Sequence, residues 1–287
     1  MAEPRPARSE GARAEGDSPT LRQTLFIYRR LVGARIRADW QFRTSFVLFL
    51  LGQFVVSLSD FAAIAVIFSA VDGLAGWSGP EVAFLYAMSG VAFGLGDLLI
   101  SPVEWASRHI KAGSFDQFLI RPVGALWQLL ATEFAPRRLG RSVQPAVVLG
   151  LSLRLVDVRW DPATVALVPV TIVSSTVIFG AIWVITSSLA FWTVETQELA
   201  NSFTYGGDFL TDYPIDVLAG WLRRLVIFVV PLASICYLPA VRLFDKPMPY
   251  DLPRAAAWSG PFVALAFALL ARAIWSLAIR HYRSTGS

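Results

Sequence analysis

Residues 163–192, ATVALVPVTIVSSTVIFGAIWVITSSLAFW, form a run of 30 residues without a charged side chain. About 20 consecutive apolar residues are enough for a helix to cross the hydrocarbon core of a bilayer. This run is too long and too apolar for a surface helix of a soluble protein. It therefore predicts a helix that spans a membrane.

The composition of the whole chain agrees with a membrane protein. Of its 287 residues, 55% are hydrophobic and only 16% are charged, whereas soluble domains carry about 25% charged residues. We expect an all-α membrane protein with six transmembrane helices. The expected spans cover residues 45–71, 82–103, 141–154, 163–192, 198–213 and 257–279.

The fifth span can be placed in two ways. Residues 198–213 are polar for a span, whereas residues 225–244 are strongly apolar but contain Pro231 and Pro239. Proline removes a backbone hydrogen-bond donor and interrupts a helix. We expect 198–213 to cross the membrane and 225–244 to dip into the outer leaflet as a broken helix. The alternative is that 225–244 is itself the fifth span.

Two regions of different character precede the first span. Residues 1–19 are rich in Pro, Ala, Gly, Arg and Glu, a composition typical of a disordered tail. Residues 20–44 repeat apolar side chains at helical spacing beside a cluster of arginines, which predicts an amphipathic helix in the lipid headgroup region. A cytosolic helix packed on the bundle is the alternative. Residues 45–283 then form one transmembrane domain.

Basic residues are distributed unequally between the loops. With the N-terminus in the cytoplasm, 17 Lys and Arg residues fall on the cytoplasmic side and seven on the other, even when Arg223 and Arg224 are counted there. Loops rich in basic residues stay in the cytoplasm. We expect both termini to be cytoplasmic. The formal charge of +4 thus reflects topology, and no nucleic-acid partner is expected.

The chain offers few residues for metal or redox chemistry. Its single cysteine, Cys236, lies in an apolar stretch, and its two histidines, His109 and His281, are far apart. A metal site needs three or four ligands close together. No metal site and no bound cofactor are therefore expected.

The loop after the second expected span contains a compact amphipathic segment, GSFDQFLIRPVGAL, at residues 113–126. Phe115, Phe118 and Leu119 make a one-turn apolar face, with Asp116 beside it. Pro122 suits the first turn of a new helix. Chemistry alone leaves two interpretations open: a helix resting on lipid headgroups, or a helix docking into a groove of a cytosolic partner.

The order of these features resembles the membrane subunit of an ABC-2-type transporter, in particular bacterial permeases encoded beside a separate ATPase. An amphipathic helix, LFIYRRLVGARIRADWQFRTSF, runs into the first span. The segment IKAGSFDQFLIRPVGALWQLL is similar to the family's Gly-x-x-Asp-x-x-Leu-x-Arg-Pro loop. The stretch YPIDVLAGWLRRLVIFVVPLASICYLPAVRLF resembles the family's late proline-rich segment.

The resemblance implies a permease subunit in the plasma (inner) membrane, which exports its substrate with energy from ATP. It implies two cytoplasmic ATPase subunits and a second permease subunit as partners. The chain has no Gly-x-x-x-x-Gly-Lys-Ser/Thr loop, so it is not expected to be an enzyme, and ATP and Mg would be bound by the partner ATPase. The implied contact with the ATPase is made by Phe115, Asp116, Phe118, Leu119, Arg121 and Pro122.

Four aspartates fall in or near the expected spans: Asp60, Asp97, Asp208 and Asp212. Such carboxylates face the bundle interior or water, so we expect them to line a pathway or to bond between helices. Two alternatives remain. One is a channel or ion-coupled transporter that needs no ATPase and uses Asp60 and Asp97. The other is an intramembrane aspartyl protease, suggested by GLGD at residues 94–97, although the partner motifs of that class are missing.

Overall fold

The computed structural model describes residues 21–70, 73–121, 123–193, 197–230 and 232–282. Within that part the secondary structure is helical, apart from one isolated bridge between Leu74 and Trp77. The all-α prediction is therefore confirmed. The expected tail at residues 1–19 and Pro122 lie outside the described residues, as does the side chain of Asp60.

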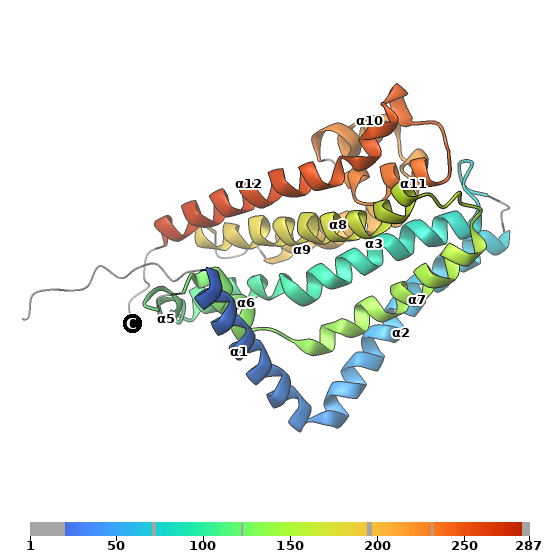
Figure 1. Ribbon diagram of the computed structural model, residues 1–287. Coiled ribbons are helices and arrows are strands. Elements are labelled where there is room, and N and C mark those ends of the chain that lie inside the picture. Colours follow the sequence, from blue (N-terminus) through green and yellow to red (C-terminus); the bar gives the residue numbers. More distant parts are fainter. Residues whose placement is uncertain (1–20, 71–72, 122, 194–196, 231, 283–287) are drawn as a thin grey trace, which may run out of the picture.

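Four helices are long and apolar enough to cross a membrane. They are α2 (Arg43–Ala70), α3 (Gly79–Leu99), α8 (Pro162–Ser188) with its continuation to Phe191, and α12 (Gly260–His281). They run along one another as a bundle (Figure 1). They correspond to the first, second, fourth and sixth expected spans, so the coarse prediction of a multi-pass helical protein is confirmed.

The third and fifth expected spans are shorter helices of the same bundle. Helix α7 (Gly140–Leu155) packs between α2 and α3, and α9 (Gln197–Thr211) packs against α8 and α3. With 16 and 15 residues they measure about 24 and 22 Å, less than the roughly 30 Å hydrocarbon core. A count of six crossings thus stays a prediction.

The apolar stretch at residues 225–244 is broken into short pieces. They are α10 (Gly220–Arg224), a π-helical turn at Leu225–Val229, a 3-10 turn at Leu232–Ser234 and α11 (Tyr237–Leu243). A continuous spanning helix over 225–244 is therefore excluded. These pieces gather at one end of the bundle (Figure 1), where the rings of Tyr237 and Trp77 lie 5.6 Å apart.

Helix α1 (Leu21–Gln41) diverges from the bundle and forms a V with α2 (Figure 1). Its first half packs on α6 (Ala125–Thr132), where the Tyr28 and Trp127 rings meet edge to face at 6.0 Å. Its second half exposes Ile36 and Trp40. Helix α1 is thus packed on the bundle along its first half and exposes apolar side chains along its second half. Its location in the lipid headgroup region stays a prediction.

Both described ends of the chain lie at the same end of the bundle. Helix α1 contacts α6 there, and Tyr282, just after α12, packs its ring 5.2 Å from that of Phe115. The short helices α4 (Ala106–Lys111) and α5 (Asp116–Leu119) belong to this end too (Figure 1). The pieces at residues 220–243 occupy the opposite end.

Candidate functional site

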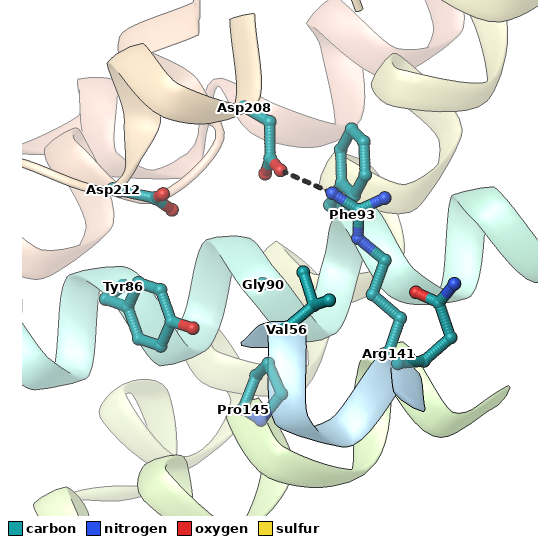
Figure 2. A pocket seen from close by; sticks show the side chains of 9 residues that line it. Val56, Tyr86, Gly90, Phe93, Arg141, Pro145, Asp208 and Asp212 are labelled. Atoms are coloured by element: carbon teal, nitrogen blue, oxygen red, sulfur yellow. Dashed lines mark ion pairs between the residues drawn. The ribbon is translucent and has the colours of Figure 1, made fainter. Parts of the chain in front are cut away.

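Polar side chains gather where α2, α3, α7 and α9 meet, and they line two adjoining pockets. The larger, called here the arginine pocket, has a volume of about 240 Å³ and is lined by Phe49, Gln53, Asp97, Arg137, Arg138, Arg141 and Tyr205. The smaller, called here the aspartate pocket, has a volume of about 30 Å³ and is lined by Gln53, Val56, Tyr86, Gly90, Phe93, Arg141, Pro145, Asp208 and Asp212 (Figure 2). The pockets share Gln53 and Arg141.

Asp97 is the most deeply placed carboxylate of this site. Its Oδ1 lies 2.6 Å from Nη1 of Arg138, which also donates to the Ser101 hydroxyl. Arg138 belongs to a 3-10 turn, Pro136–Leu139, that leads into α7. The ion pair therefore ties the end of α3 to the start of α7.

Arg141 joins the two pockets. Its Nη2 lies 3.6 Å from Oδ2 of Asp208 on α9 (Figure 2). The guanidinium carbon lies 4.4 Å from the ring centre of Phe93 and 5.2 Å from that of Tyr205. Cation–π contacts of this kind stabilise a cation away from bulk water. Arg141 thus connects α7 to both α3 and α9.

Three of the four predicted intramembrane aspartates come together in this region. Asp97 lies in the arginine pocket, and Asp208 and Asp212 line the aspartate pocket. The sequence reasoning missed the arginines, because it counted them only for topology. The spacing of Arg138 and Arg141, one helical turn apart at the start of a span, was the signal that could have placed them on one face.

The geometry around Asp97 does not suit the protease alternative. That chemistry needs two carboxylates that share a proton, whereas the Asp97 carboxylate is paired with Arg138 at 2.6 Å. Among the described residues no group of three or more His, Cys, Asp or Glu side chains could hold a metal ion. The site is a space between helices that is lined by charged side chains.

The segment at residues 113–126 forms a second site at the end that carries both chain ends. Helix α4 stops at Lys111, and Gly113 turns the chain with φ +67°, a conformation that favours glycine. Gln128 on α6 donates to the backbone carbonyls of Phe118 and Val123. These bonds hold the segment as a compact knot.

The aromatic face of the knot points inward, not toward a partner. Phe115 is fully buried, with its ring 5.1 Å from Phe191 at the end of α8 and 5.2 Å from Tyr282. Phe118 is buried against the His109 ring at 5.0 Å. In this arrangement the rings of Phe115 and Phe118 are buried within the chain, and contact of this segment with an ATPase stays a prediction. The two rings anchor the knot to α8 and α12 because their large apolar surfaces gain most from internal burial.

Polar contacts complete the anchoring of the knot. His109 Nδ1 lies 2.9 Å from the Ser114 hydroxyl, and its Nε2 lies 3.0 Å from Oε1 of Glu133. Burial, together with the neighbouring Asp116 carboxylate, raises the pKa of Tyr282 to about 12. The phenol therefore stays protonated next to Asp116, which is half-buried.

The outward side of the knot is a short ridge made of Leu119, Ile120 and Arg121, called here the Leu119–Arg121 ridge. The exposed fractions of Leu119 and Ile120 are 40% and 83%, and Arg121 is exposed as well. Ile120 therefore places an apolar side chain on the surface of a firmly held turn. Of the six predicted interface residues, Leu119 and Arg121 are the ones on this ridge.

The described residues thus form a multi-pass helical membrane protein with a charged space between its helices and a folded loop knot. Residues 54–286 match the family described as ABC-2 family transporter protein. This match covers most of the chain, so the chain belongs to the ABC-2 transporter family and is a membrane permease of an ABC transporter. Comparison with curated proteins and with solved structures gave no match.

Proposed function

We propose that the chain is the subunit that carries substrate across the plasma membrane, driven by two ATPase subunits that dock on the Leu119–Arg121 ridge. Both termini lie in the cytoplasm, and a second permease subunit completes the transporter. ATP and Mg are bound by the ATPase, and the permease supplies the pathway. The substrate is amphipathic and moves outward.

The observation that carries this proposal is the exposed ridge on a buried aromatic anchor. Ile120 is 83% exposed, whereas Phe115, five residues earlier, is fully buried. The ridge lies at the end that also holds Tyr282 and the start of α1. This end receives most of the basic residues in the sequence, which supports its placement in the cytoplasm.

The anchor offers a route by which a push on the ridge would reach the bundle. Phe115 contacts Phe191, which follows α8, and Phe191 meets Trp275 of α12 edge to face at 5.5 Å. Helices α8 and α12 pack along each other. A rigid-body movement of the knot on nucleotide binding would therefore tilt these helices, and interfaces packed in this way switch between discrete arrangements.

The surface of α2 supports pairing with a second permease. None of the residues whose burial the structure describes in its most apolar stretch, within Arg43–Ala63, is buried inside the chain. Helix α2 also forms one wall of both pockets through Gln53. A second subunit seated on α2 would close the pathway from the side, and lipid would cover the remaining face.

Ile120→Asp and Arg121→Gln test the docking of the ATPase. Both changes leave the buried anchor intact, so we expect normal membrane insertion but at least about tenfold weaker co-purification of the ATPase, as for central contacts at interfaces. Val229→Ser is the control, because Val229 is also strongly exposed but lies at the opposite end of the bundle.

Normal co-purification of both variants would show that the ridge is not the docking site. Export is tested with inverted membrane vesicles, in which ATP should drive uptake of an amphipathic substrate. Uptake that proceeds equally without ATP would instead support the channel or ion-coupled alternative.

A further inference from the structure

We propose that the arginine pocket binds the phosphate-type anionic headgroup of an amphiphile at the level of the cytoplasmic leaflet. The inference rests on the proposed function, because it identifies the transported substrate as an anionic amphiphile. Four observations carry it: the charge of the pocket, its depth, its open side and the way its arginines are held.

The charge of the pocket calls for an anion. Its lining has three arginines against one aspartate, and Asp208 of the neighbouring pocket pairs with one of the arginines, which leaves a formal excess of one positive charge. Asp97 is already paired with Arg138 at 2.6 Å, and Asp208 lies 3.6 Å from Arg141. Among the described residues no carboxylate forms an ion pair with Arg137, whose guanidinium lies 5.1 Å from the Phe49 ring centre. Uncompensated charge at membrane depth is costly and marks functional sites.

The depth of the pocket matches the headgroup region. Phe49 lies six residues after Arg43, the first residue of α2, which is about 9 Å along the helix. Asp97 lies two residues before the end of α3, and Arg138 just precedes α7. The pocket therefore lies at the end of the bundle nearest the knot, and basic pockets between transmembrane helices on the cytoplasmic side suit anionic headgroups.

One side of the pocket opens onto exposed apolar side chains of α2. Phe49 on the wall formed by α2 is 55% exposed, and Val56, two turns deeper on the same helix, is 59% exposed. An acyl chain could lie along these side chains while its headgroup occupies the pocket. The volume of about 240 Å³ exceeds several times the roughly 30 Å³ that one liquid water occupies, which leaves room for a phosphate group.

The arginines are held on a rigid turn. A Cβ at Gly140, between Arg138 and Arg141, would come within 2.7 Å of the Leu50 carbonyl oxygen of α2, so the turn lies directly against α2. Guanidinium groups bind phosphate oxygens in pairs of parallel hydrogen bonds. The Gln53 amide and the Tyr205 hydroxyl in the same lining add further donors.

The test measures binding to the purified full-length chain by native mass spectrometry. The probes are dihexanoyl phosphatidic acid, dihexanoyl phosphatidylcholine and inorganic phosphate. Arg137→Gln is the main variant, because Arg137 has no ion pair to lose among the described residues. Arg141→Lys is the second, since it keeps the charge but removes the planar donor pair. Arg30→Gln on α1 is the matched control, with its guanidinium 5.0 Å from the Phe26 ring.

We expect phosphatidic acid to bind more tightly than phosphatidylcholine, and Arg137→Gln to weaken that binding about tenfold. Arg141→Lys should weaken it to a lesser degree, and Arg30→Gln by less than about twofold. Binding of phosphatidic acid in clear excess over inorganic phosphate identifies a lipid-like amphiphile. Equal binding of both identifies a soluble phosphate compound as the source of the anion.

Equal affinity of the wild type, Arg137→Gln and Arg141→Lys for phosphatidic acid would overturn the proposal. This test is independent of the test of the proposed function, which measures co-purification of the ATPase. If the chain binds phosphatidic acid through Arg137 but recruits no ATPase, the headgroup site is supported and the proposed ATP-driven transport is rejected.

Discussion

Asp97 shows how one carboxylate is accommodated inside a helical bundle. The residue is only 5% exposed, near the end of an apolar helix. A charge in that position would be costly without a partner, and Arg138 supplies one at 2.6 Å. Ser101 accepts from the same arginine and donates to the Asp97 backbone carbonyl at 2.6 Å. The pair is thus part of a hydrogen-bonded group and not an isolated contact.

Asp97→Asn should destabilise the protein by about 3 kcal/mol, because it leaves the Arg138 guanidinium without its anion. Asp245→Asn is the matched control, since Asp245 pairs with Arg254 at 2.9 Å on the surface. An exposed pair contributes less than about 1 kcal/mol. Thermal unfolding in detergent measures both. Similar shifts in Tm for the two variants would contradict a stabilising role of the internal pair.

The sequence identified Asp97 as a polar residue within a span, but it did not identify the residues that contact it. GLGD at residues 94–97 was readable as a motif of a protease or as an interhelical polar group. The choice depends on which residue faces Asp97, and Arg138 is 41 residues away in the chain. Contacts over such separations follow from helix packing, and no local pattern encodes them.

Among the helices, the contact between α3 and α7 depends on small residues. A Cβ added at Gly94 would lie 3.0 Å from Cα of Ser142 and would overlap its hydroxyl oxygen, and one at Gly90 would lie 2.9 Å from the Pro145 ring. Close approach of this kind drives helix association in membranes, because lipid offers no hydrophobic advantage over packing. Gly94, the first glycine of GLGD, therefore serves packing, as does Gly90 one helical turn before it.

Gly94→Ala should cost about 1–3 kcal/mol by overpacking the contact with Ser142. Gly150→Ala on α7 is the control, because no atom lies within 4 Å of the added Cβ. It should be neutral or slightly stabilising, since alanine favours helix more than glycine does. Chemical or thermal unfolding in detergent compares the two. Equal stability of both variants would show that α3 and α7 can move apart without cost.

In the knot at residues 113–126, we expect the buried anchor to contribute to stability and the exposed ridge to contribute to partner binding. Phe115→Ala removes a fully buried ring and should lower stability by about 3–5 kcal/mol. Ile120→Ser on the exposed ridge should change stability by less than about 0.5 kcal/mol. Hydrogen exchange of residues 106–132 in the purified chain measures the difference. Equal protection in both variants would mean that the aromatic anchor does not hold the knot.

For the molecule as a whole, the described chain enters and leaves the bundle at the same end. The start of α1 and the residue after α12 both contact the knot region. The pieces at residues 220–243 and the Trp77 turn lie at the other end (Figure 1). An even number of crossings follows from this arrangement, and the distribution of basic residues predicts that the knot faces the cytoplasm.

Cysteine labelling in intact cells tests this orientation. In a Cys236→Ala background, Ala219→Cys at the far end should react with a membrane-impermeant thiol reagent. Ala112→Cys beside the knot should react only after the membrane is made permeable. Both positions are exposed, whereas Cys236 is buried. Reaction of Ala112→Cys in intact cells, with protection of Ala219→Cys, would reverse the topology.

Composition and hydropathy were sufficient for the class of protein. The uncharged run at residues 163–192 became α8 and its continuation, and Gly113 turns the chain with positive φ just after α4. These features depend on local chemistry: apolar length for a bilayer and backbone freedom for a turn. The family could be recognised for the same reason, because its loop motif lies within one continuous stretch.

The sequence by itself therefore determined an all-α, multi-pass protein of the ABC-2 transporter family with a folded loop after its second span. Only the tertiary structure decided that Phe115 and Phe118 face inward while Ile120 faces outward, and that Arg137, Arg138 and Arg141 share a pocket with Asp97. An amphipathic turn does not specify whether its apolar face meets the same chain or another. That choice depends on which helices lie beside it, and the partners of each buried side chain come from distant parts of the chain.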